Sequence, residues 1–141
     1  MDPRKLRRPN PGTTARTTKG YLRVTAGPCR WQYVHRIVAE ALLGRPLRRD
    51  EEVHHRNGDR RDPRAANLLI LGSSDHGWLT AKQNYFMKYL DDREKKHWDG
   101  WMIAYGNTQS QEIAKAKVAG VPWQPPPDGS MQEAWRAQPN A

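Results

Sequence analysis

The clearest helical pattern in the chain covers residues 34–42. Apolar residues stand at positions 34, 37, 38, 41 and 42, which is the i, i+3, i+4, i+7, i+8 spacing of one helix face. Gly44 follows as a C-terminal cap, and Pro46 prevents the helix from continuing. We therefore predict an amphipathic helix that buries one face.

Short apolar and alternating patterns predict strands on both sides of this helix. Residues 21–25 and 30–34 are rich in β-branched and aromatic residues and flank a Gly-Pro turn, so together they favour a hairpin. Residues 52–55 are a short strand candidate, and residues 68–71 are an apolar run bounded by turn-forming residues. A polar loop joins these last two strands.

The second half of the chain predicts helices followed by a tail. Ser73 or Ser74 can cap a helix that runs to about Lys96, and residues 108–118 favour another helix. Proline-rich sequence begins at about Val121, and we expect disorder from there onward. The predicted organisation is a basic flexible arm at 1–19, a folded domain at 20–97, a helical extension at 98–120 and a Pro-rich disordered tail at 121–141.

Composition supports one folded unit in the middle of the chain. Leu, Ile, Val and Phe make up 21 of the 141 residues, which is few for a fully globular protein, but 16 of them fall within residues 21–90. We therefore expect one compact domain with looser ends. This excludes a large enzyme core and a two-domain protein.

The charge is one-sided and indicates a polyanionic partner. The first 82 residues hold 17 Lys and Arg against 8 Asp and Glu, so they carry the whole net charge of +9. A basic surface of this kind concentrates nucleic acid, and the arm at 1–19 is expected to follow a phosphate backbone. A single cysteine, Cys29, excludes an internal disulfide and a multi-cysteine zinc site. With no signal-peptide or membrane-span pattern, we expect a cytoplasmic protein with no membrane partner.

Four residues suited to phosphodiester chemistry fall within 23 positions: His54, His55, Asn67 and His76. Hydrolysis of a phosphodiester needs a divalent cation at the phosphate and a base with a pKa near 7 to deprotonate water. Adjacent residues on a strand point to opposite sides, so one of His54 and His55 can face a metal and the other the water. His76, in the first turn of the following helix, can complete the metal site.

These residues carry a resemblance to a known family. The run VHHRNGD at 53–59, then DPR at 62–64, NL at 67–68 and His76, resembles the HNH endonuclease motif of small phage and homing-type members. Residues 35–44 also resemble the helix that leads into the motif in that group. The resemblance covers roughly residues 20–85 and makes the domain at 20–97 an HNH nuclease domain. It implies an α+β fold in which a ββα-metal finger, or His-Me finger, follows the hairpin and the amphipathic helix.

The resemblance also implies roles for the four residues. His54 and His76 would be metal ligands, and His55 would be the general base. Asn67 would tie the long loop together and hold the strand that carries His55. Thr80 occupies the position where some members supply a further histidine, so one divalent ion would keep coordination positions for water and phosphate. Its identity stays open among Mg²⁺, Mn²⁺, Ni²⁺ and Zn²⁺, and Asp75 is an additional candidate ligand.

The function implied is a metal-dependent HNH endonuclease that nicks or cuts DNA by hydrolysing phosphodiester bonds, in the cytoplasm of a bacterium or a phage-infected host. The alternative is a DNA-binding module or a phage-machine partner subunit with the same fold and little activity of its own. DNA would be held through its phosphate backbone, and residues 98–141 would contact any protein partner. The cations expected to contact DNA are Arg23, Arg30, Arg36, Arg56, Arg60 and Arg61. For His35, a bond to a neighbouring carbonyl and a phosphate contact shared with Arg36 both stay open.

Overall fold

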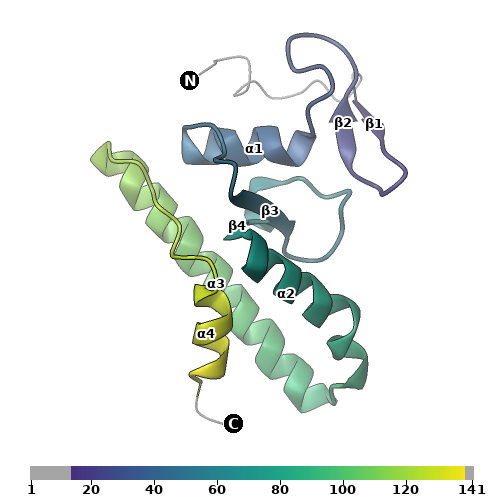
Figure 1. Cartoon of the computed structure of the whole chain (residues 1–141), viewed down its shortest axis with the longest axis vertical. Coiled ribbons are helices and arrows are strands. Elements are labelled where there is room, and N and C mark those ends of the chain that lie inside the picture. The colour runs from purple at the N-terminus through teal and green to yellow at the C-terminus, as the bar shows by residue number, and fades with distance from the viewer. Residues whose placement is uncertain (1–13, 139–141) are drawn as a thin grey trace.

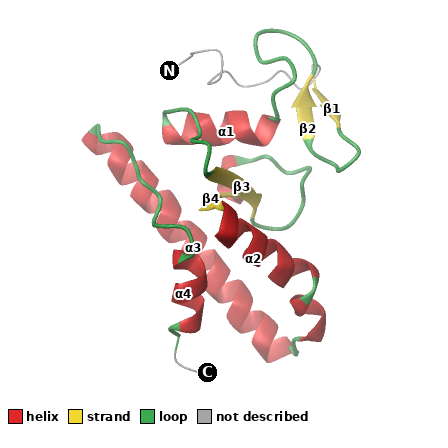
Figure 2. Cartoon of the chain, viewed as in Figure 1, coloured by secondary structure: helices red, strands yellow, loops and turns green. Residues whose placement is uncertain are grey.

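A two-stranded antiparallel sheet lies at the centre of the structure, a computed structural model that describes residues 14–138 (Figure 1). Strand β3 (Glu51–His55) pairs with β4 (Leu68–Gly72), which sets His55 opposite Leu68. The short 3₁₀ helix η3 (Ala65–Asn67) ends the loop between the two strands. Helices and strands are mixed along the chain (Figure 2), so the predicted α+β class is confirmed.

Both faces of this sheet are covered because its side chains alternate between them. Leu68 and Ile70 pack in one apolar cluster with residues of helix α1 (Val34–Leu43). The leucines that alternate with them in β4 pack in a second cluster with α2 (Ser73–Asn84). An isolated two-stranded ribbon is marginal in water, so these two helices supply the burial that stabilises it. The helix predicted at 34–42 is confirmed, and Gly44 ends it in the left-handed conformation at φ 73°.

Helix α3 (Asp92–Ala119) crosses the edge of β4 and contributes to both clusters. Trp98 and Met102 belong to the α2-side cluster, whereas Ile113 belongs to the α1-side cluster. Between them, the side-chain amide of Gln109 accepts from the Ile70 N–H and donates to the Ile70 C=O, each at 2.9 Å. Gln109 thus takes the hydrogen bonds that a third strand would make. No helix within residues 14–138 combines the length and the apolar composition that crossing a bilayer requires.

A second small sheet stands beside the N-terminal end of α1 (Figure 1). Strand β1 (Thr14–Arg16) pairs with β2 (Leu22–Val24), so residues 14–16, predicted to be part of a flexible arm, form a strand. The predicted second strand at 30–34 is wrong, because only one bridge, between Arg23 and Tyr33, remains there. Turns occupy the intervening segment, and Trp31 adopts a left-handed φ of 70° that breaks an extended backbone. Residues 1–13 of the predicted arm lie outside the described residues.

The single helix predicted from Ser73 or Ser74 to about Lys96 is interrupted. Helix α2 ends at Asn84, the 3₁₀ helix η4 (Phe86–Tyr89) follows, and α3 then begins at Asp92. The cause is a capping box, in which the Asp91 side chain accepts from the Glu94 N–H and the Glu94 side chain accepts from the Asp91 N–H. The separate helix predicted at 108–118 is the C-terminal part of α3.

The disorder predicted from about Val121 is wrong for residues 121–138. Trp123 lies in the α1-side cluster, and Met131 of helix α4 (Ser130–Arg136) is fully buried in the α2-side cluster. Two acids hold this tail in place. The Asp128 carboxylate accepts from the backbone N–H groups of Ser74 and Asp75 at 2.9 and 3.0 Å.

The Asp75 carboxylate in turn accepts from the backbone N–H groups of Gly129 and Met131 at 3.0 and 3.2 Å. Asp128 therefore caps α2, which contains Asp75, and Asp75 caps the start of α4, which follows Asp128 in the chain. The side chains of Ser73 and Ser74 do not cap α2, whose N-cap residue is Gly72. Asp75 is a structural cap here, which corrects its candidacy as a metal ligand.

We predict that Asp128→Ala lowers the free energy of unfolding by about 0.5–2 kcal/mol, since it removes the cap of α2 and loosens the tail. Urea titration followed by tryptophan fluorescence measures the change. Asp128→Asn, which keeps one acceptor oxygen, should lose less. Equal stability of all three proteins would contradict the reciprocal capping.

Candidate functional site

His54 and His55 lie on opposite faces of β3, as adjacent strand residues must. The ring of His54 lies on the α2 side, with its centroid 5.3 Å from that of His76. The ring of His55 lies on the α1 side, 4.9 Å from His35 and 5.8 Å from Tyr21. The structure thus brings His54 and His76 together and places His55 across the strand from them. Among the described residues only β4 pairs with β3, so the other edge of β3 carries no further strand.

Gln83, in the last turn of α2, fixes the ring of His54. Its amide nitrogen donates to the backbone C=O of Arg56 at 3.1 Å, and its amide oxygen lies 3.0 Å from Nε2 of His54. Because the amide nitrogen is the donor to Arg56, the oxygen accepts from an Nε2–H of His54. Nδ1 then carries the lone pair of the neutral ring. Burial, reinforced by the neighbouring His76, lowers the pKa of His54 to about 4, so this ring is neutral at pH 7.

Glu52 lies on the same face of β3 as His54, beside His76. Its Oε1 is 3.4 Å from Nδ1 of His76, and its Oε2 is buried with no hydrogen-bond partner within the described part of the chain. Across residues 14–138, however, no three His, Cys, Asp or Glu side chains are arranged to hold a metal ion together. The protein thus offers two imidazoles on this face, with one carboxylate adjacent to them.

His55 is a buried histidine whose Nε2 has no hydrogen-bond partner within the described residues. Burial lowers the pKa of His55, and the carboxylates of Asp62 and Asp59 oppose this shift. His35, beside it, has its pKa lowered to about 3, mainly by burial and then by the charge of His55. A neutral ring with a free nitrogen is the form that accepts a proton.

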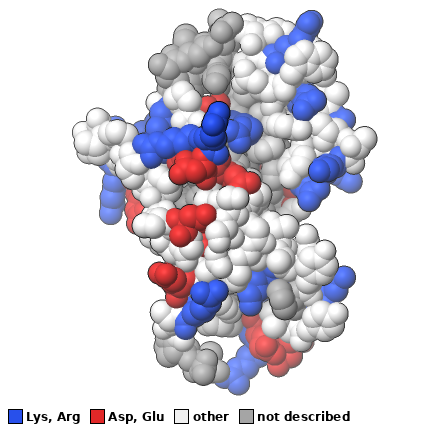
Figure 3. All heavy atoms as spheres, in the orientation of Figure 1, with Lys and Arg blue, Asp and Glu red and all other residues white. Residues whose placement is uncertain are grey.

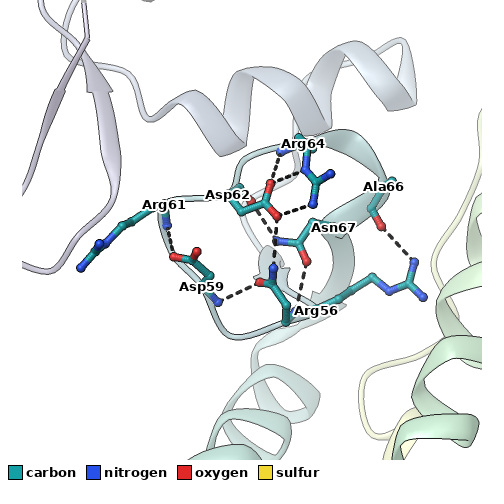
Figure 4. Close-up of polar contacts among 8 residues, drawn as sticks. Arg56, Asp59, Arg61, Asp62, Arg64, Ala66 and Asn67 are labelled. Atoms are coloured by element: carbon teal, nitrogen blue, oxygen red, sulfur yellow. Dashed lines mark hydrogen bonds and ion pairs between the residues drawn. The ribbon is translucent and has the colours of Figure 1, made fainter.

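Asn67 joins the two ends of the loop between β3 and β4 (Figure 4). Its side-chain oxygen accepts from the Asn57 N–H at 3.0 Å, and its side-chain nitrogen donates to the Asp62 C=O at 2.8 Å. Its own C=O accepts from the Arg56 N–H at 2.7 Å. The loop also contains an Asp62–Arg64 ion pair of 2.7 Å. Asn67 therefore ties the segment that follows His55 to the end of the loop that leads into β4.

Arg56 differs from the other arginines expected to contact DNA, because its guanidinium turns toward α3 (Figure 4). It donates to the backbone C=O groups of Ala66 and Ile103 at 3.0 and 3.3 Å. A Cβ at Gly106 would overlap this guanidinium, so glycine is needed for the close approach. Arg56 ties the loop to α3.

Three of the remaining arginines gather around two tyrosines near β2 and the start of α1. The Arg23 guanidinium lies 4.6 Å from the Tyr33 ring centroid, and that of Arg60 lies 5.1 Å from the Tyr21 centroid. Arg36 lies in the first turn of α1. Figure 3 shows Lys and Arg atoms gathered on this half of the molecule, over the region that Figure 1 assigns to α1 and β1–β2.

The other two arginines lie apart from this group. Arg30 stacks over the exposed ring of Trp31 at 5.7 Å. Arg61 points out of the loop, away from Asn67 (Figure 4).

Sequence reasoning missed Gln83 and Glu52, although a signal for each was present. Gln83 follows His76 by seven positions, which is two helical turns and therefore the same helix face. Glu52 precedes His54 by two positions, which is the same face of a strand. Neither residue is a letter of the motif, so the resemblance does not point to them.

We predict that Gln83→Leu removes the tautomer preference of His54. In the metal-free wild-type protein, ¹⁵N chemical shifts of the His54 ring should report a protonated Nε2 and an unprotonated Nδ1. The variant should give averaged shifts, because leucine accepts no hydrogen bond. Gln111→Leu, an exposed position on α3, should behave as wild type. An unchanged His54 spectrum in Gln83→Leu would contradict the assignment.

We predict that the low pKa of His35 makes the fold less stable in acid. The unfolded chain takes up a proton on His35 near pH ~6.5, whereas the folded chain resists protonation until about pH 3. The unfolded state binds more protons between these values, so stability falls as the pH falls through this window. His35→Phe keeps a ring and cannot protonate. Its unfolding free energy should therefore drop less between about pH 7 and pH 5 in urea titrations. His97→Phe, at an exposed position, should keep the wild-type drop, and an equal drop in His35→Phe would refute the prediction.

Part of the chain matches a known protein family. Residues 32–77 match the model of the HNH endonuclease family, a span that contains His54, His55, Asn67 and His76. No curated protein and no solved structure matches the chain. The matched span begins just before α1 and ends in the first turns of α2, so it includes both strands of the central sheet. The segment of this chain that builds the central sheet and carries its histidines is thus similar to the HNH endonuclease family.

Proposed function

We propose that the chain is a metal-dependent endonuclease that hydrolyses DNA phosphodiester bonds, with β3, β4 and α2 forming its ββα-metal finger. The observation that carries the proposal is the buried, neutral His55 on the opposite face of β3 from the His54–His76 pair. Its Nε2 has no hydrogen-bond partner within residues 14–138. A protein that only binds DNA has no use for a neutral base on the same strand as one of two neighbouring imidazoles.

His54 and His76 would hold the divalent ion. Their ring centroids are 5.3 Å apart, close to the roughly 5 Å expected for two imidazoles on one tetrahedral ion with bonds of about 2.0–2.1 Å. The neutral state of His54 and its Nδ1 lone pair also suit a metal ligand. The side-chain oxygen of Gln83 would hold its ring in place. Glu52 adds negative charge beside His76. A bound divalent ion would neutralise the scissile phosphate and stabilise the leaving oxygen.

His55 would act as general base. Its Nε2 accepts a proton from water as the water oxygen forms a bond to phosphorus, and the bond from phosphorus to one sugar oxygen breaks. The leaving oxygen is then protonated, so the products are one phosphomonoester end and one hydroxyl end. Asn67 acts as a positioning residue, since its three hydrogen bonds fix the backbone that follows His55.

The arginines around β2 and α1 would hold the DNA backbone on the His55 side of the sheet. Phosphate contacts of this kind carry little sequence information, so binding would depend on salt more than on sequence. The role of residues 98–141 in contacting another protein stays a prediction. The described part of that segment already covers the central sheet.

We predict nicking or linearisation of supercoiled plasmid in the presence of a divalent ion and none in excess chelator. A panel of Mg²⁺, Mn²⁺, Ni²⁺ and Zn²⁺ identifies the ion. His55→Ala should keep metal affinity in calorimetry and lose about 10²–10⁴ in cleavage rate, the usual worth of a positioned base. His97→Ala, which removes an exposed histidine on α3, should cut as wild type. DNA binding without cleavage under every ion would instead indicate a binding module.

A further inference from the structure

We propose that a cavity between β2, the β1–β2 turn and the N-terminal end of α1 binds one phosphate group of the nucleic-acid backbone, next to the phosphate that is cut. The cavity has a volume of about 490 Å³. This proposal rests on the proposed function only in naming nucleic acid as the source of the phosphate. The anion-binding chemistry stands on the cavity itself.

The charge of the cavity wall is entirely positive. Lys19, Arg23 and Arg36 line it, and none of the described residues in its wall is Asp or Glu. Such a site attracts an anion from solution, and guanidinium groups match the oxygens of a phosphate. Three cations converging without a carboxylate differ from the usual surface, where charges of both signs are interspersed.

Arg23 is held ready for a ligand. Its guanidinium donates to the Tyr33 hydroxyl at 2.9 Å and stacks on the ring of Tyr33, which also lines the cavity. Its Nε is buried with no hydrogen-bond partner among the described residues, and so is the hydroxyl oxygen of Thr17 on the same wall. Buried polar groups without partners are costly, so a small rotation of these two side chains toward a bound anion would satisfy both.

The end of α1 adds to this positive field. Tyr33 is the N-cap residue of α1 and makes no side-chain capping hydrogen bond, so the first N–H groups of the helix receive no cap from it. His35 and Arg36, which follow, also line the cavity. An uncapped N-terminus of a ten-residue helix favours an anion, although here it only supports what the three cations and the two unpartnered atoms already indicate.

The cavity shares a wall with His55. The rings of Tyr21 and His35 line it, and the same two rings contact the ring of His55 at 5.8 and 4.9 Å. A phosphate in the cavity is therefore separated from His55 by one layer of side chains. We infer that this phosphate neighbours the scissile phosphate on the same DNA strand. Bound there, it would fix the position of the bond to be cut.

The first test is an NMR titration of the metal-free full-length protein with inorganic phosphate, compared with chloride at equal ionic strength. Phosphate should cause saturable shifts of the amides at 17–19 and 33–36, and chloride should not. The variant Arg23→Gln/Arg36→Gln should weaken phosphate binding at least about tenfold, because it removes two charge-assisted hydrogen bonds. Arg49→Gln/Arg93→Gln has the same net charge at exposed positions and should bind as wild type.

The second test measures binding of a short DNA duplex by fluorescence anisotropy in chelator over a range of salt concentrations. If both arginines meet one phosphate, their double variant should reduce the slope of log K against log salt by about 0.9. Two separate phosphates would give about 1.8 and would overturn the single-phosphate site. If the variant with Arg49 and Arg93 replaced shows the same loss, the effect is diffuse charge and the proposal fails.

Stability and cleavage controls keep the outcomes separate. Because Arg23 contacts Tyr33, its replacement can affect folding, so Arg36→Gln and Lys19→Gln are measured singly as well. Phosphate binding that is unaffected by any of these variants overturns the cavity. Phosphate binding at the cavity in a protein that never cuts plasmid upholds the cavity and contradicts only the proposed nuclease activity. Cleavage of plasmid by a protein that binds no phosphate at the cavity contradicts the cavity and leaves the proposed nuclease activity standing.

Discussion

The burial of a two-stranded sheet on both faces is the constraint on which the rest of the structure depends. Two strands cannot stabilise themselves, so each face needs a cover of its own. Helix α1 covers the face of Leu68 and Ile70, and α2 covers the face of Leu69 and Leu71. Because successive side chains of β3 point to opposite faces of the sheet, His54 and His55 lie in separate environments.

The two edges of this sheet differ in what satisfies their backbone groups. At the β4 edge, α3 crosses the sheet and Gln109 satisfies the backbone groups of Ile70. At the β3 edge no further strand pairs among residues 14–138. Under the proposed function, a phosphate at this edge would meet the face of His55 and the face of His54 and His76 together.

The segment that matches the HNH family model is packed against the rest of the chain. Met131 and Trp123 complete the two apolar clusters, and the caps made by Asp75 and Asp128 join the tail to α2. Arg56 and Gln109 anchor the loop and β4 to α3. The residues after position 90 thus act as a scaffold for a site to which they contribute none of the four motif residues.

Local pattern in the sequence determined α1, β3, β4 and the start of α2, because a period of 3.6 or 2 is visible in neighbouring residues. The same period of 2 determined that His54 and His55 lie on opposite faces of β3. Residue chemistry within 23 positions indicated Asn67 and His76 as candidates, and the resemblance implied the positioning role of Asn67. Only the tertiary structure decided the partners of these elements. The hydrogen bonds that it decided join residues 29 to 54 positions apart: the caps made by Asp75 and Asp128, the Gln109 bonds to Ile70 and the Gln83 bond to His54. The cavity beside His55 is likewise lined by three separate segments of the chain. Such contacts depend on how helices pack around a buried sheet, and no periodicity along the chain encodes them.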